Sequence, residues 1–489
     1  MSGSTQNSTQ NSTQNHKIAG GSQLPVKIST DYQTGKRIEK GAAKDKNVYF
    51  VSLGCPKNLV DSQVMLGLLK SDEYGVIQDP NEADVIVVNT CSFIESSKVE
   101  SIDTILEMAE YKDNGKCQAL VVAGCLPQRY KTQLLKEMPE VDLFIGTGEY
   151  QNIAKLVDWA RKGELPERAY VNKPAFIHTE AHPRLQTGEF FSAYLKISEG
   201  CNRRCSFCII PTLRGNTRSR TVESLVEEAR TLASQGVKEL NLVAQDLTEY
   251  GMEHRYQKMT LEKLLPELCK IDGIEWIRLF YAYPDQFSDE LIDIMARESK
   301  IVKYLDMPIQ HTNDRILKEM NRKFTKAEIF TFEEKLWAKM PQIVIRSSTI
   351  AGFPGETEEE FQELLADLRT LKFDHLGAFA YSKEEGTKAG AMEGQVPMRT
   401  RVRRQRDIRK LHEQFSILRN KKLLGQEFTV LVEGESEETE LLLKGRHYGQ
   451  APDIDGQVLI NDGVAAAGDL VRVRITEILP YDLVGEIVT

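Results

Sequence analysis

Short apolar segments alternate with helical patterns along most of this chain, and this alternation limits the fold more than any other feature of the sequence. Near the start, Val48 to Leu53, Val85 to Val88 and Leu120 to Ala123 are apolar segments typical of strands, and helical patterns such as 61–69 and 97–108 separate them. Strands that alternate with helices predict a parallel sheet, here of the doubly wound type. We expect this first domain to span residues 47–165.

A second series of strand patterns follows a stretch, residues 166–188, that contains three prolines and is expected to be a linker. The next domain is expected over 189–424, and its six strand patterns are 192–197, 239–244, 276–281, 304–308, 344–350 and 375–379. Helical patterns such as 221–233 and 358–368 separate these strands. Six such units predict a partial β/α barrel, whose sites lie at the carboxyl ends of the strands.

The last part of the chain changes in character. Residues 399–422 form a helical pattern with ten Lys or Arg side chains, which either connects two domains or lies on an anionic partner, and the connecting role is favoured. Residues 425–489 contain five short strand patterns with Gly-rich turns, which predict a small β-barrel of the OB type. The whole chain is therefore expected to be a multidomain α/β protein that ends in a small barrel.

The first 46 residues differ from the rest, because Ser4 to Asn15 is the tetrad STQN repeated three times. Such a polar repeat cannot bury a core, so residues 1–46 are expected to be a disordered tail. They lack the basic and apolar regions of a secretory signal, and the chain has no apolar run of about 20 residues that could span a membrane. We therefore expect a cytoplasmic protein whose thiols stay reduced.

The eight cysteines carry the most specific signal. Cys201, Cys205 and Cys208 follow the first barrel strand with the spacing C-x3-C-x2-C. Three thiolates on one tight loop suit three irons of a four-iron cluster and leave the fourth iron open for a ligand. A zinc site, which usually has four ligands in paired motifs, is a less favoured alternative, and a reducing compartment disfavours a disulfide.

A second trio is scattered through the first domain, where Cys55, Cys91 and Cys125 each come just after a predicted strand. Ligands of open α/β sheets bind beyond the carboxyl ends of the strands, so these three cysteines could converge on one site. Cys117 and Cys269 lack such a placement and are expected to be structural.

The cysteine loop resembles that of the radical S-adenosylmethionine (SAM) enzymes. The resemblance implies that the open iron binds SAM and that reduction of SAM yields a 5′-deoxyadenosyl radical. It places an aromatic residue beside the adenine, and it implies SAM contacts from the strand ends and from the turn in IAGFPGETEEEF. The implied SAM-binding residues are Phe207, Gln245, Asp246, Arg346, Ser348, Gly352, Phe353, Pro354 and Glu356.

The segments LGCPKNLVDSQ, NTCSFIES and AGCLPQ resemble the amino-terminal domain of methylthiotransferases. This resemblance implies an auxiliary four-iron cluster on Cys55, Cys91 and Cys125, which holds a sulfur atom at its open iron. The chain would then carry two [4Fe-4S] clusters with three cysteine ligands each. It would also need SAM and an external electron donor, and it would complete its site as a monomer.

Methylthiotransferases have branches that modify adenosines in tRNA and a branch that modifies a ribosomal protein. LGCPKNLVDS, rather than the GCQMN-like version of the tRNA enzymes, favours the ribosomal-protein branch, as do CNRRCSFCIIP with RGNTRSR. GRHYGQAPDIDGQV is similar to that branch's carboxyl-terminal TRAM domain, although Gln450 stands where an acidic residue is usual.

Charge supports the same branch. The formal net charge is −9, and residues 427–489 alone hold 13 acidic and 4 basic side chains, which accounts for all of it. Five glutamates lie between Glu433 and Glu440. Binding to RNA depends on neutralising its phosphates, so an acidic domain favours a basic protein partner over RNA.

The resemblance to the ribosomal-protein branch implies insertion of a methylthio group at the β-carbon of an aspartate in small-subunit ribosomal protein twelve, free or within the small subunit. Modification of tRNA adenosine is the alternative, and a non-catalytic iron–sulfur module for binding or redox sensing is a second one. A C–H bond as inert as this needs a radical, which a cofactor and not a resting side chain provides.

Overall fold

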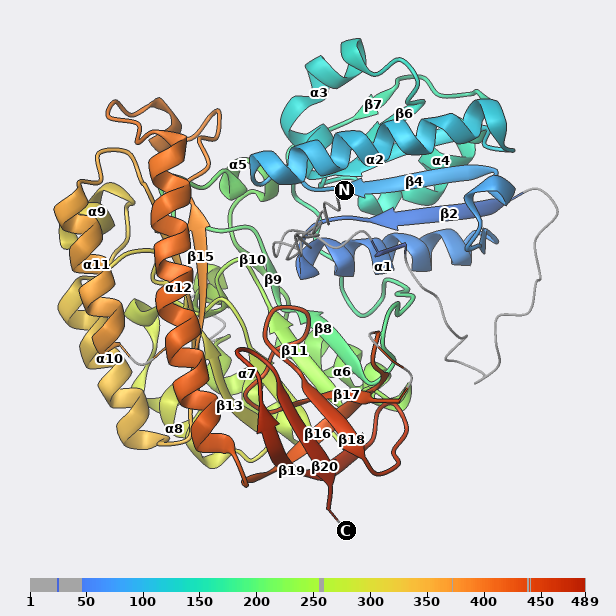
Figure 1. Ribbon diagram of the computed structural model, residues 1–489. Helices are drawn as coiled ribbons and strands as arrows, with labels where there is room; N and C mark the ends of the chain where they lie inside the picture. The colour runs from blue at the N-terminus through green and yellow to red at the C-terminus, as the bar shows by residue number, and fades with distance from the viewer. Residues whose placement is uncertain are drawn as a thin grey trace, which may run out of the picture.

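The computed structural model describes residues 24–25, 46–254, 259–371, 373–437, 439 and 441–488. They form an amino-terminal α/β domain, a central β/α domain and a carboxyl-terminal β-barrel (Figure 1). The expected tail of residues 1–46, including the STQN repeat, lies almost wholly outside the described residues. Leu24–Pro25 is the exception, because it forms a short strand, β1, that pairs antiparallel with β2 (Asn47–Ser52) and so departs from that expectation.

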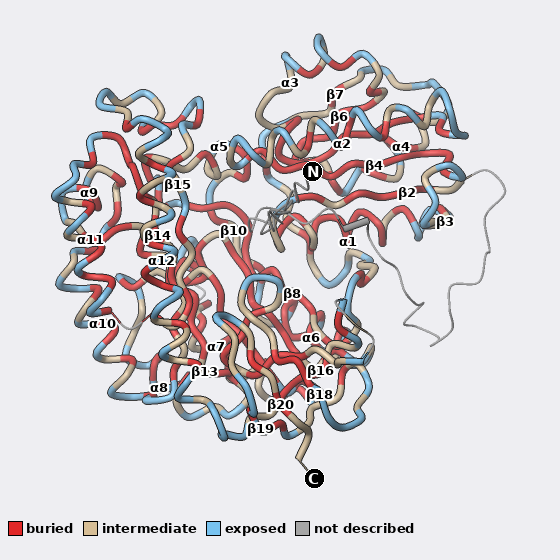
Figure 2. Tube along the Cα trace, in the orientation of Figure 1, coloured by how far each residue is buried: buried red, intermediate tan, exposed pale blue. Residues whose placement is uncertain are grey.

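The amino-terminal sheet has six strands that run parallel and lie in the order β3, β2, β4, β5, β6 and β7. Besides β2, they are β3 (Gly75–Val76), β4 (Val85–Thr90), β5 (Ala119–Gly124), β6 (Leu143–Ile145) and β7 (Ala169–Tyr170). β3 lies on one side of β2 and β4 lies on the other, as in doubly wound folds, so the strand order reverses between β2 and β4. β4 and β5 are buried over their whole length, as strands covered on both faces must be (Figure 2).

Helices cover both faces of this sheet. α1 (Pro56–Ser71) and α4 (Ile153–Lys162) pack on one face, where Met65 and Leu156 belong to one apolar core. α2 (Glu95–Asn114) and α3 (Cys125–Glu137) pack on the other face, where Ile105 and Leu134 belong to a second core. The prediction of a doubly wound domain is confirmed.

The expected linker over 166–188 differs from the structure at its start. Ala169–Tyr170 is strand β7, and the backbone N–H of Gly146 donates to the carbonyl of Tyr170 at 2.8 Å. Two residues are too few to show an alternating pattern, so no local signal indicated a strand in this proline-containing stretch. Residues 171–188, all of them described, contain no helix or strand and lead to the next domain.

The central domain is a sheet of six parallel strands in the order β8, β11, β12, β13, β14 and β15. The strands are β8 (Ser192–Lys196), β11 (Glu239–Val243), β12 (Trp276–Leu279), β13 (Ile301–Asp306), β14 (Val344–Ala351) and β15 (His375–Ala380). The main helices between them are α6 (Val222–Ser234), α7 (Leu261–Cys269), α8 (Asp289–Arg297), α10 (Lys326–Lys339) and α11 (Glu358–Thr370). β8 and β15 do not pair with each other within the described residues, so the predicted partial β/α barrel is confirmed.

The local sequence explains which residues of β14 are buried and where α11 begins. Residues of β14 alternate between buried and half-buried, so one set packs under the helices while Arg346 and Ser348 share the other face. α11 begins at a capping box, in which the Thr357 hydroxyl accepts from the N–H of Glu360 and the Glu360 carboxylate accepts from the N–H of Thr357.

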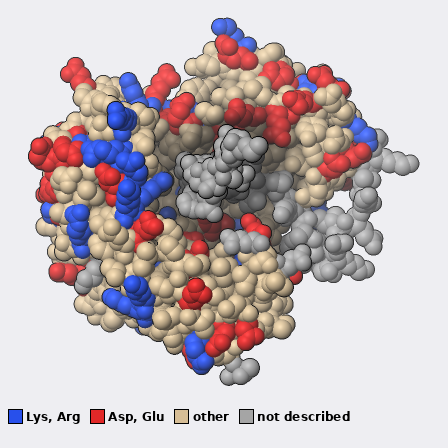
Figure 3. All heavy atoms as spheres, viewed as in Figure 1, with Lys and Arg blue, Asp and Glu red and all other residues tan. Residues whose placement is uncertain are grey.

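The basic helical pattern is α12 (Met398–Leu423), which connects the barrel to the last domain. Ile408 and Leu411 lie on its buried side. Arg406, Arg409 and Lys410 are exposed, and Lys and Arg side chains gather along this helix in Figure 3. The connecting role expected for this helix agrees with its place in the fold.

The carboxyl-terminal domain is a closed five-stranded barrel in the order β16, β17, β18, β20 and β19. Its strands are β16 (Glu427–Glu435), β17 (Leu443–His447), β18 (Val458–Asp462), β19 (Leu470–Ile478) and β20 (Leu483–Ile487). Closure removes free sheet edges, and the predicted small β-barrel is confirmed.

A polar loop of this small barrel lies against the amino ends of the central strands. The Arg446 guanidinium donates to both carboxylate oxygens of Glu239, at 3.2 and 2.7 Å, and Glu239 also accepts from Arg278 at 3.0 Å. Asp455 accepts from the Tyr304 hydroxyl at 2.8 Å and from Arg346 at 2.6 Å. Apart from Arg346, whose side chain is 14% exposed, these side chains are almost completely buried, so much of the motif GRHYGQAPDIDGQV holds two domains together.

Candidate active site

The cysteine loop of the central domain starts right after β8. Cys201 and Cys205 are buried and Cys208 is half-buried, and all three thiols are free. The loop is closed by backbone bonds, since the N–H of Cys201 donates to Gly215 O at 3.1 Å and that of Cys208 donates to Cys205 O at 3.1 Å. Burial and the neighbouring Cys205 raise the pKa of the Cys208 thiol to about 12.

Cationic side chains surround this loop. The Cys205 sulfur lies 3.2 Å from the Tyr283 hydroxyl and 3.6 Å from a nitrogen of Arg322. Arg203, within the loop, donates to Asp246 at 2.5 Å and to Asp285 at 2.7 Å. Positive charge beside the sulfurs favours their thiolate form, which is the form that binds iron.

The three cysteines of the amino-terminal domain lie together at the carboxyl ends of β2, β4 and β5. Burial, then the charges of Cys125 and Cys55, raise the pKa of Cys91 to about 12. Gly54 has φ +92°, and a β-carbon there would lie 2.7 Å from Cβ of Cys91, so only glycine lets these two loops meet. Cys55 and Cys91 thus flank the point where the strand order reverses, which is where doubly wound sheets bind ligands.

The two trios lie next to each other across the domain junction. Cys125, the first residue of α3, packs with Ile209 and Leu213, which come directly after Cys208. Figure 1 shows α5 (Ile210–Arg214) between the two domains. The positive charge of Lys57, two residues after Cys55, also acts to lower the pKa of Cys208, so one lysine lies within electrostatic reach of both trios.

A buried ionic network joins the domains beneath the cysteines. Lys196 of β8 pairs with Asp61 of α1 and, at 2.6 Å, with Glu199. Arg214 pairs with the same Asp61 and donates to the Cys125 sulfur at 3.5 Å. All four ionised side chains are at most 5% exposed, so removing one would leave charges buried without a partner.

The aromatic residues with an expected role in SAM binding come together. Phe207 packs against a cluster that includes Phe353, Ile316 and Tyr381. Glu356 accepts from the backbone N–H groups of Gly352 at 2.8 Å and Phe353 at 3.1 Å, so it fixes the turn after β14.

Packing within the protein explains why a glycine stands at position 352. It has φ +77°, and a β-carbon there would lie 2.5 Å from Cγ of Arg401 on α12. The missing side chain of Gly352 lets α12 approach this turn, and the buried Pro354 continues the same turn.

The other residues expected to contact SAM differ in how many of their polar atoms are already hydrogen-bonded within the protein. Gln245 donates to Glu199 at 2.7 Å, but its oxygen is buried and has no hydrogen-bond partner among the described residues. Both oxygens of Asp246 accept hydrogen bonds, from Arg203 and from Thr248, so this residue braces the cysteine loop. Arg346 is paired with Asp455, and Ser348 accepts the N–H of Gln310 through its carbonyl at 2.8 Å.

These residues fit iron–sulfur clusters and SAM in their chemistry. Each trio offers three free thiols beside a cation, and the unpaired Gln245 oxygen offers an acceptor near the loop. Within the described ranges, no three His, Cys, Asp or Glu side chains are close enough to hold a single metal ion. A four-iron cluster does not need such a close group, because each of its three thiolates binds a different iron. Cys117 and Cys269 pack in apolar cores instead.

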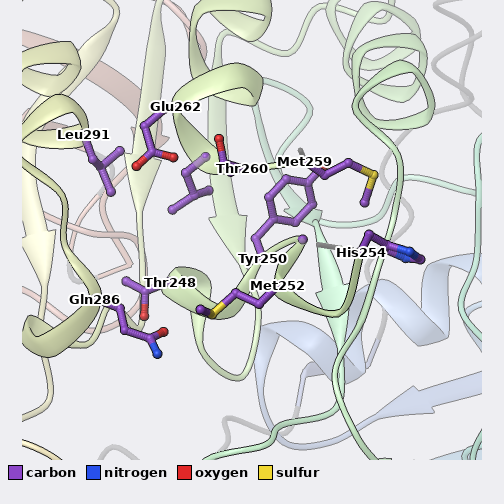
Figure 4. A pocket seen from close by; sticks show the side chains of 11 residues that line it. Thr248, Tyr250, Met252, His254, Met259, Thr260, Glu262, Gln286 and Leu291 are labelled. Carbon is purple, nitrogen blue, oxygen red and sulfur yellow. The ribbon is translucent and has the colours of Figure 1, made fainter. Parts of the chain in front are cut away.

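A cavity of about 330 Å³ lies elsewhere in the central domain. Figure 4 shows that Thr248, Tyr250, His254, Met259 and Glu262 line it. None of the eight cysteines belongs to its lining, so the cavity is separate from the two trios.

Sequence reasoning missed the charged and aromatic residues around the thiols. They come from four different segments and are Lys57, Arg214, Arg322 and the pair Tyr281 and Tyr283. Lys57 lies inside LGCPKNLVDSQ and Arg214 lies just before GNTRSR, so their positions in these motifs could have indicated a place near the thiols. No sequence motif marks the two tyrosines or Arg322.

Family models match three parts of the chain. Residues 47–146 match Uncharacterized protein family UPF0004, residues 195–368 match the Radical SAM superfamily, and residues 424–488 match the TRAM domain. The radical SAM methyltransferase TsrM from Kitasatospora setae, solved with cobalamin and a [4Fe-4S] cluster, is similar in fold. Its TM-score is 0.52 at 14% identity, over 71% of this chain and 77% of that chain. A partial barrel with a three-cysteine loop after its first strand, together with the second match, defines a radical SAM enzyme.

Full-length relatives narrow this class. The ribosomal protein uS12 methylthiotransferase RimO of Geobacter sulfurreducens is 52% identical over 448 residues, which is 91% of this chain and 99% of that protein. RimO of Geotalea uraniireducens is 51% identical over 91% of this chain and 98% of its own, and RimO of Bdellovibrio bacteriovorus is 48% identical over 92% and 99%. The chain belongs to the RimO family of radical SAM methylthiotransferases.

Proposed function

We propose that this enzyme inserts a methylthio group at the β-carbon of an aspartate in ribosomal protein uS12. The observation that supports this most is the name shared by relatives about 50% identical over nine-tenths of the chain, which are uS12 methylthiotransferases. The adjacency of the two cysteine trios suits such a reaction, because sulfur and radical must both reach one carbon atom.

Each trio has a separate role in the proposal. Cys201, Cys205 and Cys208 would hold the cluster that binds SAM, and Cys55, Cys91 and Cys125 would hold the auxiliary cluster. When bound, the two clusters and SAM supply the electron, the radical, the sulfur and the methyl group of the reaction. The protein holds the reacting atoms in place and keeps water away from them.

The remaining SAM-site residues would act by shape and by hydrogen bonding. Phe207 and Phe353 form an apolar wall beside the cysteine loop, and Gln245 offers its unpaired oxygen. Asp246 and Glu356 would act indirectly, since their oxygens hold the loop and the turn in place. Arg346 and Ser348 share one face of β14, and Gly352 and Pro354 shape the turn that follows it.

The acidic surface of the last domain is proposed to dock the basic substrate protein. Glu435, Glu437, Asp462 and Glu477 are exposed there. Two other acids are not available for docking, because Asp455 is buried against Arg346 and Glu433 is paired with Arg446 at 2.6 Å. Glu438 and Glu440 lie outside the described residues. The docking surface is therefore smaller than the count of acidic residues suggests.

We also infer that the enzyme works in the cytoplasm, as a monomer, with an external electron donor. Among the described residues, no helix is long and apolar enough to cross a bilayer.

A competition assay tests the proposed function. The enzyme with both clusters reconstituted is given SAM, a reductant, purified uS12 and unmodified tRNA together, and mass spectrometry then identifies which one gains a methylthio group. A gain on one aspartate of uS12 supports the proposal, and a gain on adenosine supports the tRNA alternative. Formation of no 5′-deoxyadenosine under any condition would support the non-catalytic alternative.

A further inference from the structure

Lys57 is a buried cation at the junction of the two cysteine trios. It lies in the first turn of α1, two residues after Cys55, and is 9% exposed. Its ammonium lies 3.5 Å from the centroid of the Tyr281 ring. An aromatic face stabilises a cation but does not neutralise it.

Several buried cations of this region have carboxylate partners, whereas Lys57, like Arg322, has none among the described residues. Lys196 is paired with Asp61 and Glu199, Arg203 with Asp246 and Asp285, and Arg346 with Asp455. No carboxylate of the described residues lies within 4.0 Å of the Lys57 ammonium. Asp306 acts on Lys57 only from beyond 4.0 Å and accepts the N–H of Tyr281 instead. A carboxylate that entered here would therefore supply the direct ion pair that the buried Lys57 lacks.

The residue under Lys57 is held in a strained backbone conformation. Tyr281 follows β12 at the carboxyl end of the barrel and has φ +58°, which an aromatic residue rarely adopts. Its N–H donates to the Asp306 carboxylate at 3.3 Å, and its carbonyl accepts from Leu247 at 3.0 Å. Such strain persists where the surroundings enforce it, and it is common in ligand sites.

We propose that Lys57 binds the side-chain carboxylate of the substrate aspartate between the two trios. This inference rests on the proposed function, and no covalent step is involved, only an ion pair. The β-carbon of aspartate is bonded directly to its carboxyl carbon. A grip on the carboxylate therefore fixes the carbon that is to react.

The same position gives a reason for substrate choice. Adenine is neutral and would leave a buried ammonium without a counter-ion, whereas an aspartate supplies one. Lys57 would therefore select an acidic side chain over a nucleobase.

The test compares Lys57→Met with the wild type, both with two clusters, on uS12 and on uS12 whose target aspartate is changed to asparagine. Binding of each protein is measured by calorimetry. The wild type is expected to bind the aspartate form about tenfold to a hundredfold tighter, as a charge-assisted contact implies. Lys57→Met should lose that preference, and Lys57→Arg should keep part of it.

Lys155→Met is the matched control, because Lys155 is exposed and lies 4.4 Å from the ring of Trp159, away from the cysteines. It should keep the full preference. Iron content and the EPR spectrum of the reduced clusters are measured for every variant, together with thermal unfolding.

Two results would overturn the inference. One is that Lys57→Met still prefers aspartate as the wild type does, and the other is that its main defect is loss of iron, which would assign Lys57 to the cluster. The proposed function fails separately, when the wild-type enzyme modifies tRNA and not uS12.

Discussion

The Arg214 guanidinium, which belongs to the central domain, donates a hydrogen bond to the Cys125 sulfur of the amino-terminal domain over 3.5 Å. The same guanidinium pairs with Asp61 and is shielded from water, since its side chain is 3% exposed. One cation thus links the domain junction to a thiol of the proposed auxiliary cluster. A hydrogen bond and a positive charge at a ligand sulfur favour the reduced form of a cluster.

Replacing Arg214 by Met should make the auxiliary cluster harder to reduce and the domain junction weaker. Redox titration followed by EPR would show a more negative midpoint potential, best measured with Cys201, Cys205 and Cys208 all changed to Ala. The free energy of unfolding should fall by about 3–5 kcal/mol, because Asp61 and Lys196 lose part of a buried network. Arg214→Lys keeps the charge and should lie between the two. An unchanged potential in Arg214→Met would contradict this role.

Single cysteine changes should separate the two proposed clusters. Cys205→Ala is expected to abolish reductive cleavage of SAM, seen as loss of 5′-deoxyadenosine in a chromatogram. Cys91→Ala is expected to keep that cleavage but form no methylthioaspartate. Cys117→Ala serves as the control, since this thiol packs in an apolar core and donates to the Ala119 carbonyl at 3.3 Å. Methylthioaspartate made by Cys91→Ala would show that the auxiliary site is assigned wrongly.

The sequence allowed the longer strands, the order of the domains and the two cysteine trios to be predicted, because these depend on local patterns, whereas the short strands β3, β6 and β7 were missed. Val85 to Val88 is a strand whatever surrounds it, and C-x3-C-x2-C is confined to one loop. The contact of Arg214 with Cys125 joins residues 89 positions apart, and that of Lys57 with Tyr281 joins two domains. Neither partner carries a local signal for the other, so only the folded chain reveals these pairs.

The bond between the last two domains should depend on pH through Glu239. Burial alone would raise its pKa, but Arg446 and Arg278 outweigh burial and lower the pKa to about 2, from 4.5 in an unfolded chain. Its stabilising contribution is therefore complete above about pH 5 and is lost as the pH falls from 4.5 toward 2. Glu239→Gln should lower stability by about 3–5 kcal/mol at pH 7, since two guanidinium groups lose their partner.

Urea unfolding followed by circular dichroism checks this prediction. The difference between wild type and Glu239→Gln should be constant from pH 7 to 5 and should shrink below about pH 4.5. Glu433→Gln is the matched control, because Glu433 binds the same Arg446 but its side chain is 17% exposed. It should have the smaller effect, and a difference independent of pH down to 3.5 would refute the assignment.

Gly352→Ala should destabilise the turn after β14 by more than backbone strain alone. The new methyl group would lie 2.5 Å from Cγ of Arg401, and overpacking of this kind costs about 1–3 kcal/mol. Gly425→Ala isolates the strain, since Gly425 has φ +79° and no atom within 4 Å of the added carbon. In thermal unfolding, Gly352→Ala should have the lower melting temperature of the two variants. Equal melting temperatures would show that α12 shifts to accommodate the added methyl group.

Reversing exposed acidic charges on the last domain should weaken substrate docking without slowing the reaction. The double variant Glu435→Lys, Glu437→Lys is expected to raise KM for uS12 several-fold while kcat stays the same. The effect should decrease at high salt, as screening of surface charges requires. The exposed Glu73 and Glu107 of the amino-terminal domain, changed together to Lys, provide the control. An equal rise of KM in both double variants would argue against a specific docking surface.

The burial of Arg446 and Asp455 against Glu239, Tyr304 and Arg346 has a consequence for protein engineering. The last domain folds as its own barrel, yet its Arg446 and Asp455 pair with buried charges at the amino ends of the central strands. A chimaera that received this domain from a tRNA-modifying relative would also need matching residues at positions 239, 278, 304 and 346. The proposed docking role of this domain would therefore be transferred only together with these residues of the central domain.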